Sequence, residues 1–250
     1  MNNITFSFII TFLAGLTTMI GIIPIYINKN KEQKIIPISL AFSSGVMITI
    51  SILSLIPESV TLISNYFYNV PSFIITFIFI VLGILLSIYI DKGIEKKITN
   101  NNLYKLGIIS IIVLMLHNIP EGITTFLSTT NNKTLGITLS LAIALHNIPE
   151  GISIAVPIYY STKSKLKAWG YTFISGFSEL FGAIIAYVFL KNYINDFILG
   201  IILAMTAGIM IHISIYELLP NSIEYKKKRL TTLSFLIGTL VMFVCKTLLS

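Results

Sequence analysis

The sequence predicts an all-α integral membrane protein whose eight helices cross the membrane. Three observations support this fold class. Hydrophobic residues make up 55% of the 250 residues, and charged residues make up only 11%. Soluble domains carry about 25% charged residues, so this chain has too few to cover a water-facing surface. Long apolar runs recur along the whole chain, each near the roughly 20 residues that a helix needs to cross the hydrocarbon core.

The apolar runs give the eight expected spans in order. They lie at residues 4–27, 36–56, 71–90, 106–128, 134–158, 168–190, 194–219 and 231–249. The first run has no basic residue before it and no small-residue cleavage site after it, which favours a retained span over a signal peptide. No stretch is long or polar enough for a separate soluble domain. Residues 1–250 are therefore expected to form a single transmembrane domain.

The basic residues predict the orientation of these spans. Most of the 17 Lys and Arg residues lie in the connections after spans one, three, five and seven: Lys29, Lys31, Lys34, Lys92, Lys96, Lys97, Lys105, Lys163, Lys165, Lys167, Lys226, Lys227, Lys228 and Arg229. Lys133, Lys191 and Lys246 lie elsewhere. The positive-inside rule then places the basic loops in the cytoplasm and both termini outside. The net charge of +7 is interpreted as this topology signal, and no nucleic-acid partner is expected.

Internal similarity links the second and seventh spans. Residues 41–59 align without gaps on residues 204–222, and ten of the nineteen positions are identical, including Gly45, Met47 and Pro57. By the charge pattern these two spans run in opposite directions. Related segments of opposite orientation are typical of inverted repeats, which let a transporter alternate its access.

A second repeat is identical over eight residues. The segment LHNIPEGI occurs at residues 116–123 and again at residues 145–152, near the middles of the fourth and fifth spans. These spans also run in opposite directions, so their polar groups are expected to meet at one membrane depth. Each motif ends near a glycine, Gly122 or Gly151, which lets another helix or an ion approach the backbone.

The spacing within each motif indicates a binding site. His117 and Glu121 are four residues apart, as are His146 and Glu150, so each pair shares one helix face one turn apart. These four side chains are our candidate metal ligands. The two motifs thus predict a site built from two imidazoles and two carboxylates.

The remaining motif positions extend this prediction. Asn118 and Asn147 follow the histidines and are close enough around the helix for their side chains to join the same group of ligand atoms. Pro120 and Pro149 have no amide hydrogen, so each frees a backbone carbonyl one turn earlier and predicts a broken or kinked helix. Such irregular backbone is tolerated in a membrane where it lines a cavity or is buried in protein.

Charge balance favours a metal at this site. Glu121, Glu150 and Glu179 lie near the centres of three spans, with no Lys or Arg at matching depth. A charged side chain at mid-bilayer costs at least about 2.5–3.5 kcal/mol, and a bound cation would compensate it. Nitrogen and oxygen donors without thiolates suit zinc, ferrous iron, manganese or cobalt and argue against cuprous copper.

Other interpretations remain open at this stage. A lone intramembrane His or Glu can serve helix packing, and packing is the default role of Ser178 beside Glu179. An intramembrane metalloenzyme with a di-metal site is the alternative function. A protease would need H-E-x-x-H, which is absent, and a di-iron bundle would use Glu-x-x-His. A metal sensor would be expected to carry a soluble binding region.

The paired H-N-I-P-E-G motifs resemble the ZIP (Zrt/Irt-like) metal transporters, and most closely the bacterial ZupT-like zinc-uptake branch. The segments SGFSELFG at residues 175–182 and ELLP at residues 217–220 extend the resemblance over the whole chain. It implies a 3+2+3 inverted-repeat bundle in the cell membrane, zinc uptake into the cytoplasm, often a homodimer, no enzymatic activity and no resident cofactor. The metal ligands it implies are His117, Asn118, Glu121, His146, Asn147 and Glu150, with Glu179 helping to hold a second ion in some members.

Four positions bear on the entry or exit path of the ion. Relatives in this branch often carry Glu where this sequence has Ser54. Glu58, one turn later, either replaces that carboxylate or lies at a solvated span end. Glu217 occupies the corresponding place in the seventh span. His212 is either a buried packing residue or an auxiliary ligand.

Overall fold

The computed structural model describes residues 3–27, 32–95, 102–190 and 195–249. These residues form helices, and no strand occurs among them. The helices, in chain order, are α1 (Asn3–Leu16), the 3-10 segment η1 (Thr17–Tyr26), α2 (Glu32–Ile50), the π segment η3 (Ser51–Leu55), α3 (Ile56–Ser64), α4 (Asn69–Glu95), α5 (Asn102–Asn131), α6 (Lys133–Thr162), α7 (Lys165–Ile185), the π segment η4 (Ala186–Leu190), α8 (Asp196–His212), the π segment η5 (Ile213–Leu218), α9 (Leu219–Ile223) and α10 (Lys228–Leu249).

Eight helical stretches in the described residues are long and apolar enough to cross a membrane, which confirms the predicted fold class. Most of them extend beyond the predicted apolar runs. The second expected span, 36–56, is a continuous helical stretch over 32–64, in which the π segment η3 joins α2 to α3 just ahead of Pro57. The fourth and fifth stretches run unbroken through Pro120 and Pro149, so of the broken or kinked helix expected there, the break is absent.

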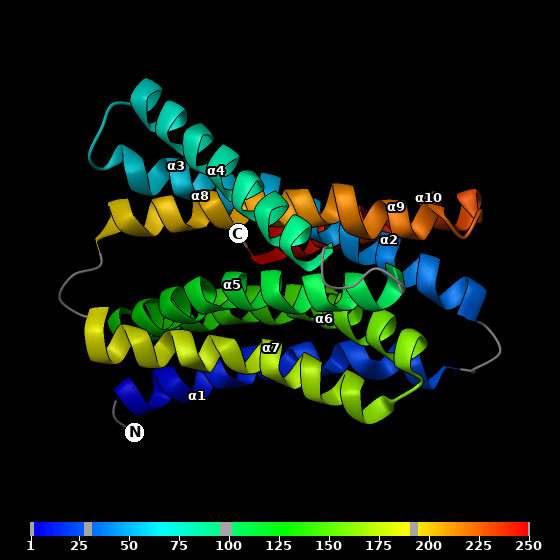
Figure 1. Ribbon diagram of the computed structural model, residues 1–250. Helices are drawn as coiled ribbons and strands as arrows, with labels where there is room; N and C mark the ends of the chain where they lie inside the picture. Colours follow the sequence, from blue (N-terminus) through cyan, green and yellow to red (C-terminus); the bar gives the residue numbers. More distant parts are fainter. Residues whose placement is uncertain (1–2, 28–31, 96–101, 191–194, 250) are drawn as a thin grey trace.

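The helices form two layers (Figure 1). One layer contains α2, α3, α4, α8, α9 and α10, and the other contains α1, α5, α6 and α7. The motif helices α5 and α6 lie on the inner side of their layer, where α6 packs against α2 and α5 packs against α8. The helices that carry the candidate ligands therefore lie at the boundary between the two layers.

Within the first layer, the same hydrogen bond occurs twice. The hydroxyl of Ser59 donates to the carbonyl of Gly200 over 2.7 Å. The hydroxyl of Ser222 donates to the carbonyl of Pro37 over 2.8 Å. Ser222 and Gly200 each follow their counterparts, Ser59 and Pro37, by 163 positions. In the first bond the donor belongs to the first repeat and the acceptor to the second, and in the other bond the donor belongs to the second repeat and the acceptor to the first.

Close glycine contacts recur in the same way. A Cβ added to Gly45 of α2 would collide with the carbonyl oxygen of Phe235 of α10, and one added to Gly208 of α8 would collide with that of Ile80 of α4. Gly208 follows Gly45 by 163 positions, and Phe235 follows Ile80 by 155. The α2–α10 and α8–α4 pairs are therefore joined by equivalent backbone contacts.

Both repeats also contain a π segment at the same place. η3 covers Ser51–Leu55 and η5 covers Ile213–Leu218, and each lies just before a proline, Pro57 or Pro220. A π turn accommodates one extra residue in a helix, and such turns are frequent at functional sites. In this chain they join α2 to α3 and α8 to α9.

The half of the bundle away from the start of α1 has a closed apolar interior. Its fully buried side chains come from both layers: Ile36, Leu40, Leu106, Ile109, Leu114, Ile154 and Ile158. Of the basic connections, the structure describes Lys34, Lys92, Lys105, Lys163, Lys165, Lys167 and residues 226–229, whereas Lys29, Lys31, Lys96, Lys97 and the separate Lys191 lie outside the described residues. The described basic connections, at the starts of α2, α5, α7 and α10, lie at the end of the bundle away from the start of α1 (Figure 1).

Candidate metal site

Two helices of equal length carry the candidate ligands. α5 and α6 each contain 30 residues, and the repeated motif lies near the middle of both. Because the helices are antiparallel neighbours, the two histidine–glutamate faces meet at one depth. His117 and Glu150 are fully buried, and Glu121 and His146 are 3% exposed.

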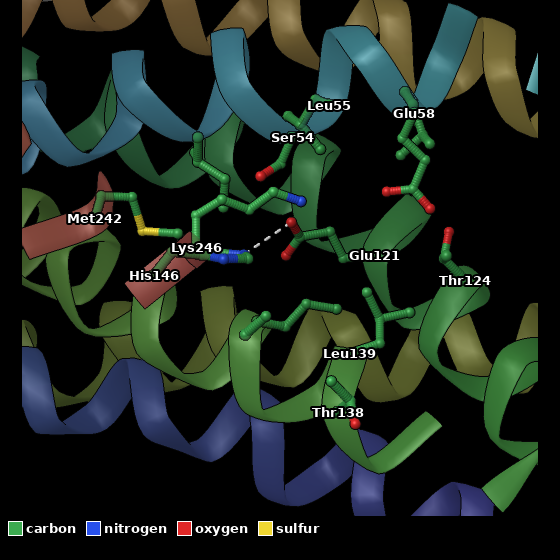
Figure 2. Close-up of a pocket in the computed structure, with 14 residues that line it drawn as sticks. Ser54, Leu55, Glu58, Glu121, Thr124, Thr138, Leu139, His146, Met242 and Lys246 are labelled. Carbon is green, nitrogen blue, oxygen red and sulfur yellow. Dashed lines mark hydrogen bonds and ion pairs between the residues drawn. The ribbon is translucent and has the colours of Figure 1, made fainter. Parts of the chain in front are cut away.

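The structure brings these four side chains together. One ligand atom from each of His117, Glu121, His146 and Glu150 lies within 4.8 Å of the others. Nε2 of His117 is 3.1 Å from Oε1 of Glu121 and 3.0 Å from Oε1 of Glu150. Nε2 of His146 is 2.9 Å from Oε1 of Glu121, the contact drawn in Figure 2. The predicted face-to-face arrangement of the motifs is therefore present.

This donor set fits a transition-metal ion. Zinc binds imidazole nitrogens and carboxylate oxygens at about 2 Å, commonly with four ligands. Oε2 of Glu121 and Oε2 of Glu150 are buried without a hydrogen-bond partner among the described residues. Buried polar groups normally find a partner. Two unpartnered carboxylate oxygens beside two imidazoles match the ligand requirements of a cation.

The two asparagines tie the motif helices to their neighbours. Nδ2 of Asn118 donates to the carbonyl of Ser175 on α7 over 3.0 Å, and Nδ2 of Asn147 donates to the carbonyl of Ala14 on α1 over 3.0 Å. Their Oδ1 atoms are buried without a hydrogen-bond partner among the described residues. The amide nitrogens thus fix the side chains, and the amide oxygens remain available as ligands.

Glu179 lies beside the cluster but outside the group of four. It is fully buried on α7, where one carboxylate oxygen accepts a hydrogen bond from Nδ2 of Asn147. Its second oxygen has no hydrogen-bond partner within the described part of the chain. The predicted third central glutamate therefore reaches the site through Asn147.

The motif glycines permit close approach of helices. A Cβ on Gly122 would collide with the carbonyl oxygen of Glu179, and a Cβ on Gly151 would collide with that of Thr18. The glycines therefore bring α7 and η1 against the backbone of the motif helices. Of the two roles expected for them, the structure supports helix packing.

A cavity of about 210 Å³ adjoins the cluster (Figure 2). Glu121 and His146 form part of its wall, together with Ser54, Glu58 and Lys246. Glu58 is exposed, whereas Ser54 is half-buried. Thr124 near the end of α5 and Thr138 near the start of α6 also line the cavity, so it lies in the half of the bundle that contains the start of α1, and both Ser54 and Glu58 face it.

The other two candidate path residues lie away from the cluster. His212 is buried, its Nδ1 is 2.8 Å from the hydroxyl of Ser87, and its ring stacks on Tyr216. These contacts correspond to the packing role. Glu217 is buried within η5 and is not in the group of four.

Sequence reasoning did not identify Lys246 as a cavity residue. Its signal was the spacing on the last helix, where Gly238, Met242 and Lys246 recur every four residues and so share one face. Gly238 faces the backbone of α2, and Met242 is buried. This face therefore points into the bundle.

Comparisons with known proteins agree over nearly the whole chain. A family model described as "ZIP Zinc transporter" matches residues 94–246. The chain is similar to the zinc transporter ZupT of Clostridium perfringens, with 36% identity over 98% of this chain and 96% of the relative. It is 35% identical to zinc transporter ZupT of Oceanobacillus iheyensis, with both chains covered completely. It is 38% identical to zinc transporter ZupT of Streptococcus mutans, with 95% of each chain covered.

Proposed function

Because the chain belongs to the ZIP zinc transporter family, we propose that it carries zinc into the cytoplasm through the four-residue cluster between α5 and α6. Family membership makes it a multi-pass membrane transporter of the bacterial plasma membrane and not an enzyme. The alternative interpretation as an intramembrane metalloenzyme is thereby set aside.

The observation that carries the site assignment is the convergence of His117, Glu121, His146 and Glu150. Two carboxylates buried in the middle of a membrane protein are costly unless a cation or a proton compensates them. The four donors lie within 4.8 Å of one another and supply the nitrogen and oxygen ligands that zinc accepts. The same donors also suit ferrous iron, manganese and cobalt, so we expect zinc first and these ions as weaker cargo.

Asn118, Asn147 and Glu179 are proposed to form the second part of the site. The amide nitrogens are used in helix contacts, while both amide oxygens and one Glu179 oxygen have no hydrogen-bond partner among the described residues. An ion leaving the four-residue cluster toward α7 would meet these oxygens. Occupation by a second ion is part of the proposal.

The position of the cavity supports a direction of transport. The cavity reaches Glu121 and His146 from the half of the bundle that contains the start of α1, and the other half is closed by apolar packing. If both termini lie outside, as the basic loops predict, the ion enters from outside. The described conformation is then open toward the outside and closed toward the cytoplasm.

The two layers suggest how the ion crosses. Repeated contacts join α2 to α10 and α4 to α8, which supports a 3+2+3 inverted repeat and a first layer that behaves as a rigid unit. The ligands belong to α5 and α6 in the other layer. Sliding one layer past the other would open the site to either side in turn, as inverted repeats permit.

Uptake by the purified protein in proteoliposomes tests this proposal. We expect saturable accumulation of zinc with the parent protein, slower uptake of iron, manganese and cobalt, and none in empty vesicles. Absence of zinc uptake by correctly oriented, folded protein would contradict it.

A further inference from the structure

The cavity that leads to the cluster is lined by a positively charged side chain. Lys246 of α10 is the one lysine or arginine among the described residues that line it. Two carboxylates, Glu58 and Glu121, line the same cavity. In Figure 2 the side chain of Lys246 extends into the cavity on the side of Ser54 and Glu121. A positive side chain therefore lies on the path by which a metal ion would approach the site.

The helix geometry directs this lysine inward. Lys246 is on the same face of α10 as Met242, which is 4% exposed and also lines the cavity. The outward face of α10 carries large apolar side chains such as Leu240 and Leu248, which are 60% and 80% exposed. A lysine that only anchored the end of a helix could sit on that outward face. Lys246 instead is half-buried at the cavity.

No direct ion pair among the described residues fixes the position of the Lys246 ammonium group. The charge of Lys246 interacts electrostatically with the carboxylate of Glu58. It forms no direct ion pair with any acidic side chain that the structure describes. A lysine has a flexible four-carbon stem with a compact charge at its end, and the apolar wall of the cavity can accommodate that stem. The ammonium can therefore move among the cavity carboxylates without breaking a fixed contact.

We propose that Lys246 acts as an internal competitor, which balances the cavity carboxylates when no metal is present and must be displaced when a divalent ion enters. This inference rests on the proposed function, since it assigns the cavity to the entering ion. A cleft of one sign of charge raises the local concentration of the opposite ion by about tenfold or more. The ammonium lowers that enrichment and so sets the zinc concentration at which the site fills.

The experiment uses the full chain with two readouts. Zinc uptake in proteoliposomes gives KM and kcat, and competition with a chelating dye gives the Kd of zinc for the purified protein. The test variant is Lys246→Gln, and Lys246→Met is the second variant if the first does not fold. Lys246→Arg keeps the charge. Lys133→Gln is the matched control, because Lys133 is exposed at the start of α6 and lies over the ring of Phe6, away from the cavity.

We expect Lys246→Gln to lower KM and Kd for zinc by about three- to tenfold while kcat changes by less than about twofold. Lys246→Arg and Lys133→Gln should keep the parent values. An unchanged or higher Kd in both neutral variants, Lys246→Gln and Lys246→Met, would overturn the proposal. If the parent protein binds zinc but does not transport it, the proposed function fails, and the comparison of Kd values still decides the role of Lys246.

Discussion

Glu121 on α5 lies 2.9 Å from His146 on α6, and this contact joins the two copies of the repeated motif. The same carboxylate oxygen is 3.1 Å from Nε2 of His117 on its own helix. Glu121 therefore touches both histidines of the cluster. One carboxylate shared by two imidazoles makes the two motifs a single site.

Replacing the cluster carboxylates should stop transport without unfolding the protein. We expect Glu121→Gln and Glu150→Gln each to reduce saturable zinc uptake at least about 100-fold, since loss of a charged ligand weakens metal binding by several kcal/mol. Uptake is measured in proteoliposomes, with folding checked by size-exclusion chromatography. The matched control is Glu224→Gln, an exposed glutamate beyond α9. Parent-like uptake by the double variant would contradict the site.

The predicted orientation can be mapped with single cysteines after Cys245 is replaced by Ser. Tyr68, which is 90% exposed, lies between α3 and α4, and Lys165 begins α7 at the basic end. An impermeant maleimide added to intact cells should label Tyr68→Cys, whereas Lys165→Cys should react only after permeabilisation. Labelling of the Lys165 position from outside would reverse the assigned topology.

The glycine contacts predict a stability difference between two similar substitutions. Gly122→Ala adds a Cβ that overlaps the Glu179 carbonyl, and overpacking of this kind costs about 1–3 kcal/mol. Gly170→Ala on α7 is the control, because nothing lies within 4 Å of its added Cβ. We expect a lower melting temperature in detergent for the first variant and an equal or higher one for the second. Equal melting temperatures would mean that α5 and α7 are less tightly packed than described.

A contact between the layers should respond to transport. Lys163 at the end of α6 is 2.6 Å from Glu32 at the start of α2, at the end of the bundle that is closed. Being exposed, the pair itself contributes only about 0–1 kcal/mol. If the layers slide, linking cysteines at these two positions with a short bis-maleimide should stop zinc uptake.

The control crosslink joins two residues of one layer. The indole nitrogen of Trp169 on α7 donates to the hydroxyl of Tyr26 on η1 over 2.9 Å. Cysteines at these two positions, linked by the same reagent, should leave uptake close to the parent rate. Undiminished flux through protein that is fully linked between Lys163 and Glu32 would favour a channel-like path over moving layers.

Local patterns accounted for the spans and the cluster. Apolar run length predicts membrane spans, and the four-residue spacing of His117 and Glu121 predicts a shared helix face. Both are properties of one helix at a time. The destination of the Asn118 amide on α7 and the inward position of Lys246 depend on which helices become neighbours. Single-sequence patterns carry little information about that choice.

Of the broken or kinked helix expected at Pro120 and Pro149, the break is absent. A proline in a helix interior removes one helical hydrogen bond and kinks or breaks the helix. In a membrane bundle, neighbouring side chains can bind to irregular backbone. Here the hydroxyl of Ser43 on α2 donates to the carbonyl of Pro149 over 2.7 Å. A contact that comes from another layer is not visible in the motif.

The π segments η3 and η5 limit how the length of this chain can change. Successive residues of a helix are about 100° apart, and each π segment holds one residue more than a regular turn. Deleting one residue within Ser51–Leu55 would remove the extra residue and leave a regular turn, with Glu58 and Ser59 near their present faces. Deleting one residue within the regular turns of α2 would instead rotate everything beyond it by about 100°, which would turn Glu58 from the cavity wall and Ser59 from the carbonyl of Gly200. Single-residue deletions should therefore be better tolerated within Ser51–Leu55 than within α2.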